Sequence, residues 1–326
     1  MRVSDDEWNA IARRYRRFAA SEAHDVSPLY EQLALKIAES TALLAFLQTL
    51  PDERRQPNLF LAAIRDAAGG ILTPDDLEPS VRRFATRIRD IMVTRTTQTN
   101  EPARCAVLLP ALARLQQPLA LLEIGASAGL CLLPDRYGYD YGRHRIAPPS
   151  DSAPVFNCVA NAATPLPHRQ PDIAWRCGLD LNPLDVKSPT DMAWLETLVW
   201  PGQEQRAVNL HAAIEVARTD PPTIRQGNLL TDLARVLADA PENIPRVVFH
   251  TAVLAYIPSQ ADRDAFAQAM LASDAIWISN EAPSVFPQFA KDAPPPPGVR
   301  HFLLAMNGKP LAWTDPHGRS IDWFAA

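Results

Sequence analysis

The chain has 326 residues, of which 21% are charged and 47% are hydrophobic, a globular composition that excludes disorder, collagen and a coiled coil as the main structure. Lys and Arg together number 32 and Asp and Glu 37, giving a formal net charge of -5. No overall positive field therefore attracts a nucleic-acid backbone or an anionic membrane. We expect a small-molecule substrate as partner, with no nucleic acid and no membrane.

Neither a targeting segment nor a membrane span is expected. The N-terminal sequence MRVSDDEWNA is acidic where a secretory signal would be basic. The most apolar region, residues 105–126, is interrupted by prolines and charged residues and lacks the ~20 apolar residues of a bilayer span. The four cysteines include no C-x-x-C pair and are typical of reduced thiols. The sequence predicts a cytoplasmic protein, and the absence of H-x-x-x-H and H-E-x-x-H spacings predicts no metal site.

Residues 1–117 are expected to form an all-helical region. Ser4 and Glu7 match a capping box that precedes apolar residues at helical spacing. Further start signals, each a capping residue with a proline soon after it, occur at Ser27-Pro28, Thr73-Pro74 and Asn100-Glu101-Pro102. The arginines within residues 13–17 are expected to form a solvated helix face rather than a phosphate site.

From residue 118 the pattern changes to short apolar runs separated by helical or proline-rich connections, which predicts an α/β fold. The strands are expected at residues 119–124, 173–179, 222–226, 246–251, 275–280, 301–306 and 310–313, with helices at 203–217, 229–237 and 260–272. Asn307-Gly308 between the last two strands predicts a β-hairpin. The domain over residues 118–326 should therefore be a Rossmann-like, mostly parallel sheet that closes with an antiparallel hairpin.

A glycine-rich turn follows the first expected strand in LALLEIGASAGLCLL, residues 119–133, and a helix is expected after it. Small residues let backbone N–H groups approach a ligand, and the start of a helix offers unpaired donors. Glu123 precedes the turn, where its charge repels phosphate and suits a ligand with an amino group. This turn is the first candidate for a binding site.

Polar residues also end the next two strands. Asp180 ends the second strand, where a nucleoside ribose is held through its hydroxyls, and Asn228 follows the third, where an amide can bond an adenine edge. This ordered set resembles the Class I S-adenosylmethionine-dependent methyltransferase superfamily over roughly residues 118–326. The resemblance implies S-adenosylmethionine as cofactor, with Asp180 on the ribose and Asn228 facing the adenine. It also implies a methionine and ribose pocket shaped by Glu123, Gly125, Ser127 and Gly129.

Across nearly the whole chain, the sequence also resembles a family of uncharacterised bacterial proteins known as a domain of unknown function. The resemblance rests on SPLYEQLALKIA, LLEIGASAGL, DRYGYDYG, CGLDLNPLDV, VWPGQEQR, VVFHTAVLAYIP and DPHGRSIDWF. It implies no particular reaction. Where that pattern would place an asparagine after Gly129-Leu130, this chain has Cys131.

An insertion is expected at about residues 134–171. Gly125 and Asp180 are 55 positions apart, far more than the ~20 residues of a simple βαβ unit. The insertion contains Tyr137, Tyr139 and Tyr141. It is either a lid or substrate wall over the pocket, or a structural flap that packs its tyrosines on the helical region.

Residues at the ends of the fourth and fifth strands are candidates for chemistry. His250 is the expected base that takes a proton from the acceptor, Glu281 could orient it, and His317 could serve as a second acid or base. Each could instead be structural. The expected activity is methyl transfer to a small-molecule O or N acceptor. The alternative is a non-catalytic protein of the same fold that binds a nucleoside ligand.

A serine hydrolase is a weaker alternative. Residues 125–129 also match G-x-S-x-G, with Ser127 as the nucleophile, and Glu281 and His317 follow in the order of α/β-hydrolases. That fold needs several strands and an oxyanion loop before the nucleophile, whereas the sequence before residue 118 is expected to be helical. The hydrolase also leaves Glu123, Asp180 and Asn228 without a role.

Overall fold

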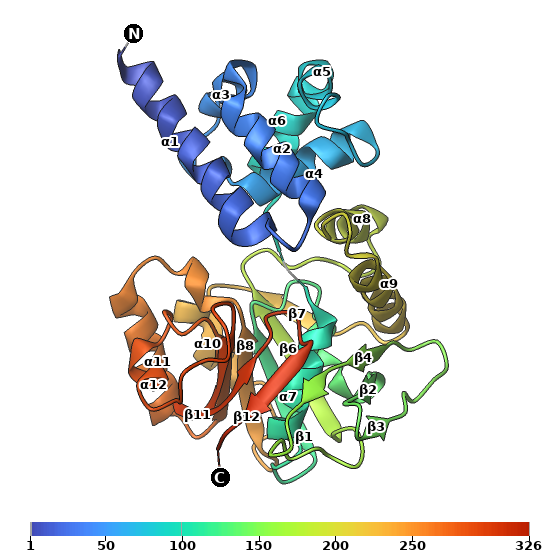
Figure 1. The fold of residues 1–326 in the computed structure, drawn as a ribbon. Helices are drawn as coiled ribbons and strands as arrows, with labels where there is room; N and C mark the ends of the chain where they lie inside the picture. The colour runs from blue at the N-terminus through green and yellow to red at the C-terminus, as the bar shows by residue number, and fades with distance from the viewer. Residues whose placement is uncertain (1, 99, 326) are drawn as a thin grey trace. The chain divides into compact units, whose positions relative to one another are not determined.

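The computed structural model describes residues 2–98 and 100–325, with side chains described from residue 6 onward. The chain divides into two compact units (Figure 1). Unit 1 comprises Met1–Thr99 and Ala193–Val208, and unit 2 comprises Asn100–Met192 and Asn209–Ala326. Because the boundaries at 192 and 208 fall inside helices α8 (Pro189–Thr197) and α9 (Glu204–Thr219), each of these helices contributes residues to both units.

Unit 1 is helical, and it contains most of the helical region that the sequence predicts at residues 1–117, whereas residues 100–117 belong to unit 2. The other helices of unit 1 are α1 (Arg2–Phe18), α2 (Pro28–Glu39), α3 (Thr41–Gln48), α4 (Pro57–Ala68), α5 (Leu77–Arg83) and α6 (Ala85–Thr94). Ser27 caps α2 as expected, because its side-chain oxygen accepts the N–H of Tyr30 and Pro28 supplies the first helical residue. Apolar side chains of these helices form one buried core that includes Tyr15, Phe60 and Trp194.

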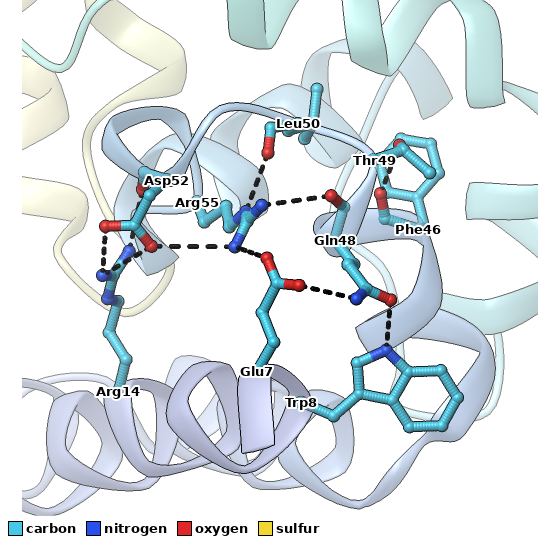
Figure 2. Close-up of polar contacts among 9 residues, drawn as sticks. All are labelled: Glu7, Trp8, Arg14, Phe46, Gln48, Thr49, Leu50, Asp52 and Arg55. Atoms are coloured by element: carbon cyan, nitrogen blue, oxygen red, sulfur yellow. Dashed lines mark hydrogen bonds and ion pairs between the residues drawn. The ribbon is translucent and has the colours of Figure 1, made fainter. Parts of the chain in front are cut away.

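The capping box predicted at Ser4 and Glu7 does not begin the first helix. Helix α1 begins at Arg2, so the backbone of Ser4 lies inside it, and the side chain of Ser4 is outside the described side chains. The carboxylate of Glu7 instead accepts hydrogen bonds from Gln48 and Arg55, as Figure 2 shows. The first helix therefore begins before the capping box that the sequence predicts.

Unit 2 contains a nine-stranded sheet in the order β5-β12-β11-β10-β9-β8-β1-β6-β7. Five strands are parallel: β1 (Leu119–Ile124), β6 (Ile173–Asp180), β7 (Thr223–Gln226), β8 (Arg246–Thr251) and β9 (Ile276–Glu281). Numbered along the chain they lie in the order 3-2-1-4-5, the doubly wound arrangement of Rossmann-like folds. Strand order reverses between β1 and β8, which makes the carboxyl ends of these two strands the topological switch point.

The antiparallel part of the sheet follows β9. It consists of β10 (Phe302–Met306), β11 (Lys309–Thr314) and β12 (Ser320–Trp323), and the two-residue strand β5 (Val159–Ala160) pairs with β12 at the edge. Asn307 and Gly308 both have left-handed φ angles, 48° and 73°, as a tight type I′ hairpin requires. The predicted α/β fold with a closing antiparallel hairpin is therefore confirmed.

One face of the sheet is covered by α10 (Leu229–Leu237), α11 (Gln260–Ala272) and α12 (Pro287–Ala290), which share a core with Leu122, Val248 and Trp277. Helix α7 (Cys105–Leu112) also belongs to unit 2 and is buried along its whole length. None of the helices in the described residues combines the length and hydropathy that crossing a lipid bilayer requires.

The insertion forms a small separate sheet of β2 (Gly138–Asp140), β3 (Arg145–Ile146) and β4 (Val155–Asn157). Its three tyrosines are buried, and the hydroxyls of Tyr137, Tyr139 and Tyr141 donate to the backbone carbonyls of residues 130, 134 and 106. Buried tyrosines with satisfied hydroxyls behave as packing residues. This arrangement favours the structural flap over the lid, although of the three hydroxyls it is that of Tyr141 that bonds to the expected helical region, at Ala106.

Candidate functional site

The loop after β1 has an unusual backbone. Gly125, Ser127 and Gly129 have φ angles of 69°, 53° and 73°, so three of five consecutive residues are left-handed. Ser127 is the one that is not glycine, and this conformation costs a side-chain-bearing residue of order 1 kcal/mol or more. Such strain persists where the surrounding structure holds it, and it is concentrated at functional sites.

Asp180 holds this loop in place from the neighbouring strand. Its Oδ2 accepts the backbone N–H of Ser127 at 2.8 Å, and its Oδ1 accepts the N–H of Asn182 at 2.7 Å. The N–H of Gly125 donates to the carbonyl of Leu179 at 2.8 Å. Each carboxylate oxygen has a second acceptor site, so Asp180 can anchor the loop and still accept a hydroxyl. Its predicted contact with a ribose remains a prediction.

The helix expected after the glycine loop does not form. The chain instead makes two short 3₁₀ helices, Leu130–Leu132 and Pro134–Arg136. A proline disfavours the helical conformation of the residue before it, and Leu133, between them, has φ -113° and ψ 38°. The loop therefore lacks the aligned N–H groups that an α-helix would direct at an anionic ligand.

Asn228 begins the next helix. Its Oδ1 accepts the N–H of Leu230 at 2.9 Å and so caps α10. The side-chain oxygen of Asn228 is thereby occupied by the helix cap. A contact with adenine would therefore use the side-chain amide nitrogen of Asn228. Asn228 is exposed at the carboxyl end of β7, the strand next to β6.

Two exposed leucines flank these polar residues, and sequence reasoning missed them. Leu181 follows Asp180 and is 59% exposed, and Leu230 follows Asn228 by two positions and is 45% exposed. The side chain of Gln226 links the two strand ends by donating to the carbonyl of Leu181 at 3.1 Å. Exposed apolar side chains at the ends of adjacent strands suit a flat apolar ligand such as a nucleobase. The sequence does contain a signal for these leucines, because in LDLNP and GNLL an apolar residue follows soon after Asp180 and Asn228.

Glu123 is a buried acid at the end of β1. It is 4% exposed, and no hydrogen-bond partner of its Oε2 is found among the described residues. Burial raises the pKa of this carboxyl well above its usual range, and the nearby Cys131 and Asp180 raise it further, whereas Arg104 opposes the shift. The carboxyl group of Glu123 therefore favours either a bound proton or a cationic partner beside it.

Further buried polar atoms near the same strand ends lack a partner among the described residues. They are Ser127 Oγ, Asn280 Nδ2 and Glu281 Oε2. Native proteins satisfy nearly all buried polar atoms, so each exception requires a ligand, a water or a role in strain. Four such atoms, counting Glu123 Oε2, lie in or beside strands β1 and β9. Together with the left-handed loop at residues 125–129, these atoms make the carboxyl end of the sheet the candidate site.

His250 is placed differently from the expected base. It is fully buried, its Nδ1 lies 2.7 Å from Glu281 Oε1, and its Nε2 accepts the indole N–H of Trp277 at 3.0 Å. Both ring nitrogens are thus engaged inside the protein. This geometry favours a structural role for His250 over proton transfer with a substrate.

His317 and Glu281, which the hydrolase alternative would use together, pair with different residues. His317 Nδ1 lies 3.3 Å from Glu101 Oε2, whereas Glu281 pairs with His250. The side chain of His317 is 28% exposed. Its loop is held by Asp315, whose Oδ1 accepts the N–H of His317 at 2.9 Å. Glu101, which sequence reasoning did not single out as a site residue, also binds the thiol of Cys131 through its backbone carbonyl at 3.3 Å.

Comparison with known proteins identifies one family. The family model described as an uncharacterized protein conserved in bacteria, DUF2332, matches residues 12–71 and 72–323. These ranges contain every site residue described above, and they confirm the resemblance to a bacterial family of unknown function. No curated protein and no solved structure matches the chain significantly.

Proposed function

The chain belongs to the DUF2332 family of bacterial proteins, and we propose that it is an S-adenosylmethionine-dependent methyltransferase acting on a small-molecule oxygen or nitrogen acceptor. The observation that carries the proposal is the left-handed loop at Gly125–Gly129, which lies at the switch point of a 3-2-1-4-5 sheet and is anchored by Asp180. Sheets of this kind bind ligands beyond the carboxyl ends of their strands.

The residues at these strand ends fit an adenosyl ligand. Leu181 and Leu230 offer apolar surface for the adenine, and the remaining acceptor sites of Asp180 suit ribose hydroxyls. The buried Oε2 of Glu123 suits the amino group of the methionine part. When bound, S-adenosylmethionine supplies an electrophilic methyl group on its sulfonium. The protein's part is to hold the ligand, orient the acceptor and exclude water.

Proton removal from the acceptor falls to His317 rather than to His250. His317 is partly exposed, and the carboxylate of Glu101 beside it can stabilise the imidazolium that forms when the ring takes a proton. His250 has no free ring nitrogen for this task. Within the proposal, the pair of His317 and Glu101 is therefore the base.

Calorimetric titration of the full chain with S-adenosylmethionine and S-adenosylhomocysteine tests the cofactor class. We expect dissociation constants in the micromolar range, and at least tenfold weaker binding in Leu181→Asp, which places a charge where the adenine would lie. Leu271→Asp is the matched control, because Leu271 is also exposed, at 50%, but lies in α11. No heat from either ligand would exclude the proposal. Binding without S-adenosylhomocysteine production from any acceptor would favour the non-catalytic alternative.

A serine hydrolase is the second candidate, and Ser127 is the observation that favours it. Its left-handed φ of 53° is a feature of a nucleophile on a sharp turn, and its Oγ has no partner among the described residues. Covalent labelling with a fluorophosphonate tests this activity. Labelling of the wild type and not of Ser127→Ala would support the hydrolase, and absence of labelling would exclude it.

A further inference from the structure

The side chains of His250, near the end of β8, and of Trp277 and Glu281, the second and the last residue of β9, form a buried polar group. Glu281 Oε1 lies 2.7 Å from His250 Nδ1, and it accepts the backbone N–H groups of Val253 and Leu254 at 2.9 Å and 3.1 Å. Glu281 is 2% exposed and His250 is fully buried. One carboxylate oxygen therefore joins the end of β9 to the turn that follows β8.

The tautomer of His250 follows from its two partners. An indole N–H can only donate, so Nε2, which receives it from Trp277, carries no hydrogen. The remaining ring nitrogen, Nδ1, therefore bears the proton and donates it to Glu281. A neutral imidazole fixed in this way orients the carboxylate, and it cannot take a proton without breaking the bond to Trp277.

The turn after β8 is strained and lies against the glycine loop. Ala252 has a left-handed φ of 57°, and its N–H donates to the carbonyl of Asn280 at 3.1 Å. A Cβ built on Gly125 would approach Cγ2 of Val253 to 2.4 Å, so the Val253 side chain packs directly on that glycine. Strained backbone persists only where its surroundings hold it, and here Glu281 and Asn280 supply the hydrogen bonds.

We propose that Glu281 and His250 are positioning residues: Glu281 fixes the turn at residues 252–254, and Val253 then holds Gly125 and the rest of the glycine loop in their left-handed shape. His250 keeps the carboxylate of Glu281 aimed at the two N–H groups of the turn. The strand-end glutamate and histidine thus act on the protein's own backbone. Only the consequence for ligand affinity rests on the proposed function, because the loop's shape can be measured without ligand.

The experiment compares amide hydrogen exchange and S-adenosylhomocysteine titration in the full chain. Glu281→Met removes the acceptor at similar size, and we expect about tenfold or faster exchange at Val253, Leu254 and the glycine loop, with affinity about tenfold weaker. Glu281→Gln keeps an acceptor oxygen and should return both values to within about threefold of wild type. The control is Thr164→Val, which deletes the hydroxyl of a buried threonine that donates to Asn161 at 2.7 Å, in the insertion. It should lower the melting temperature without changing exchange in the loop.

A second variant tests whether the turn acts on the glycine loop through the side chain of Val253. It also keeps the proposal testable if Glu281→Met does not fold. Val253→Ala retains the bonds from Glu281 and removes the contact with Gly125. We expect faster exchange in the glycine loop and unchanged exchange at Leu254. Unchanged loop exchange in both Glu281→Met and Val253→Ala would overturn the positioning role. If the wild type binds no S-adenosylhomocysteine, the proposed function fails, and the exchange measurements still decide this inference.

Discussion

The carboxylate of Asp180 accepts the backbone N–H of Ser127 at 2.8 Å and so fixes a left-handed residue 53 positions earlier in the chain. Its other oxygen accepts the N–H of Asn182. We expect Asp180→Ala to release the loop and to weaken S-adenosylhomocysteine binding by tenfold or more, because hydrogen bonds to a charged group contribute ~1.5–3 kcal/mol each. Calorimetry measures the affinity, and amide exchange at Ser127 measures the order of the loop.

A neutral variant of the same size tests whether the loop needs both carboxylate oxygens of Asp180. Asp180→Asn retains one acceptor oxygen and places an amide N–H₂ against the other backbone donor, so it should disturb the loop as well as the affinity. Asp185→Ala is the control, because that carboxylate also accepts a nearby backbone N–H group, that of Lys187 at 2.8 Å. Wild-type affinity in Asp180→Ala would contradict both the anchor and the ribose assignments.

Glu123 should make stability depend on pH. Burial raises its pKa well above the usual range, so between the pKa of the unfolded chain and the higher pKa of the folded protein, the folded state holds a proton that the unfolded chain has released. The stabilisation is fully present below the unfolded pKa and is lost as pH rises through the folded pKa. Glu123→Gln removes this dependence. Its free energy of unfolding should exceed that of the wild type by an amount that grows by up to ~1.4 kcal/mol per pH unit.

Urea denaturation of both proteins from pH 5 to pH 8 measures this difference. Glutamine has nearly the same shape as glutamate, so packing stays nearly constant. A difference between the two proteins in how the free energy of unfolding changes with pH is therefore due to the proton on Glu123. Parallel stability curves would show that Glu123 is ionised and paired in the folded protein, and that it does not hold a proton.

Gly125 should tolerate alanine poorly for two separable reasons. Its φ of 69° strains any residue with a Cβ, and that Cβ would meet Val253. Strain and overpacking together should cost ~2–4 kcal/mol in Gly125→Ala. Gly142 provides the control, because its φ is 74° and nothing lies within 4 Å of the added Cβ, so Gly142→Ala should cost only ~1–2 kcal/mol.

Double-mutant analysis by urea denaturation then isolates the contact. Val253→Ala should recover part of the loss in Gly125→Ala, with a coupling energy of ~1 kcal/mol or more for groups that touch. Additive effects of the two substitutions would mean that strain at Gly125, rather than contact with Val253, requires the glycine.

The central strands and helices were predictable because their signals are local. β1 and β8 are mostly apolar and are buried on both faces, and their observed bounds are those predicted. The bounds of α10 and α11 are also those predicted, since each has a capping residue at its start. β12 was missed, because a strand of four residues is defined by its partner across the sheet more than by its own sequence.

The candidate site was predictable in position and not in detail. The sequence places Asp180 and His250 at strand ends, and the structure does so too. It does not reveal their partners, because the bonds from Ser127 to Asp180 and from Trp277 to His250 depend on strand order and register. Leu133-Pro134 is a local signal against a helix after Gly129. The prediction followed the glycine pattern, which is typical of a helix start, and was wrong.

Arg55 should be the polar residue on which unit 1 depends most. Its side chain is 9% exposed and donates to the carbonyls of Leu50 and Gln48 at 2.8 Å and 3.1 Å and to the carboxylate of Glu7 at 2.6 Å (Figure 2). Arg55→Met leaves these acceptors without their donor and should cost ~2–4 kcal/mol of unfolding free energy. Thermal denaturation of the full chain measures the loss, and amide exchange in α1 and α3 assigns it to unit 1.

Arg14 supplies the control within the same network. It pairs with Asp52 at 3.0 Å, but the two side chains are 38% and 69% exposed. Solvent screens such a pair, so Arg14→Met should change the free energy of unfolding by no more than ~0.5 kcal/mol. Equal losses in Arg14→Met and Arg55→Met would show that charge at this surface, rather than the buried hydrogen bonds of the guanidinium, stabilises the packing of α1.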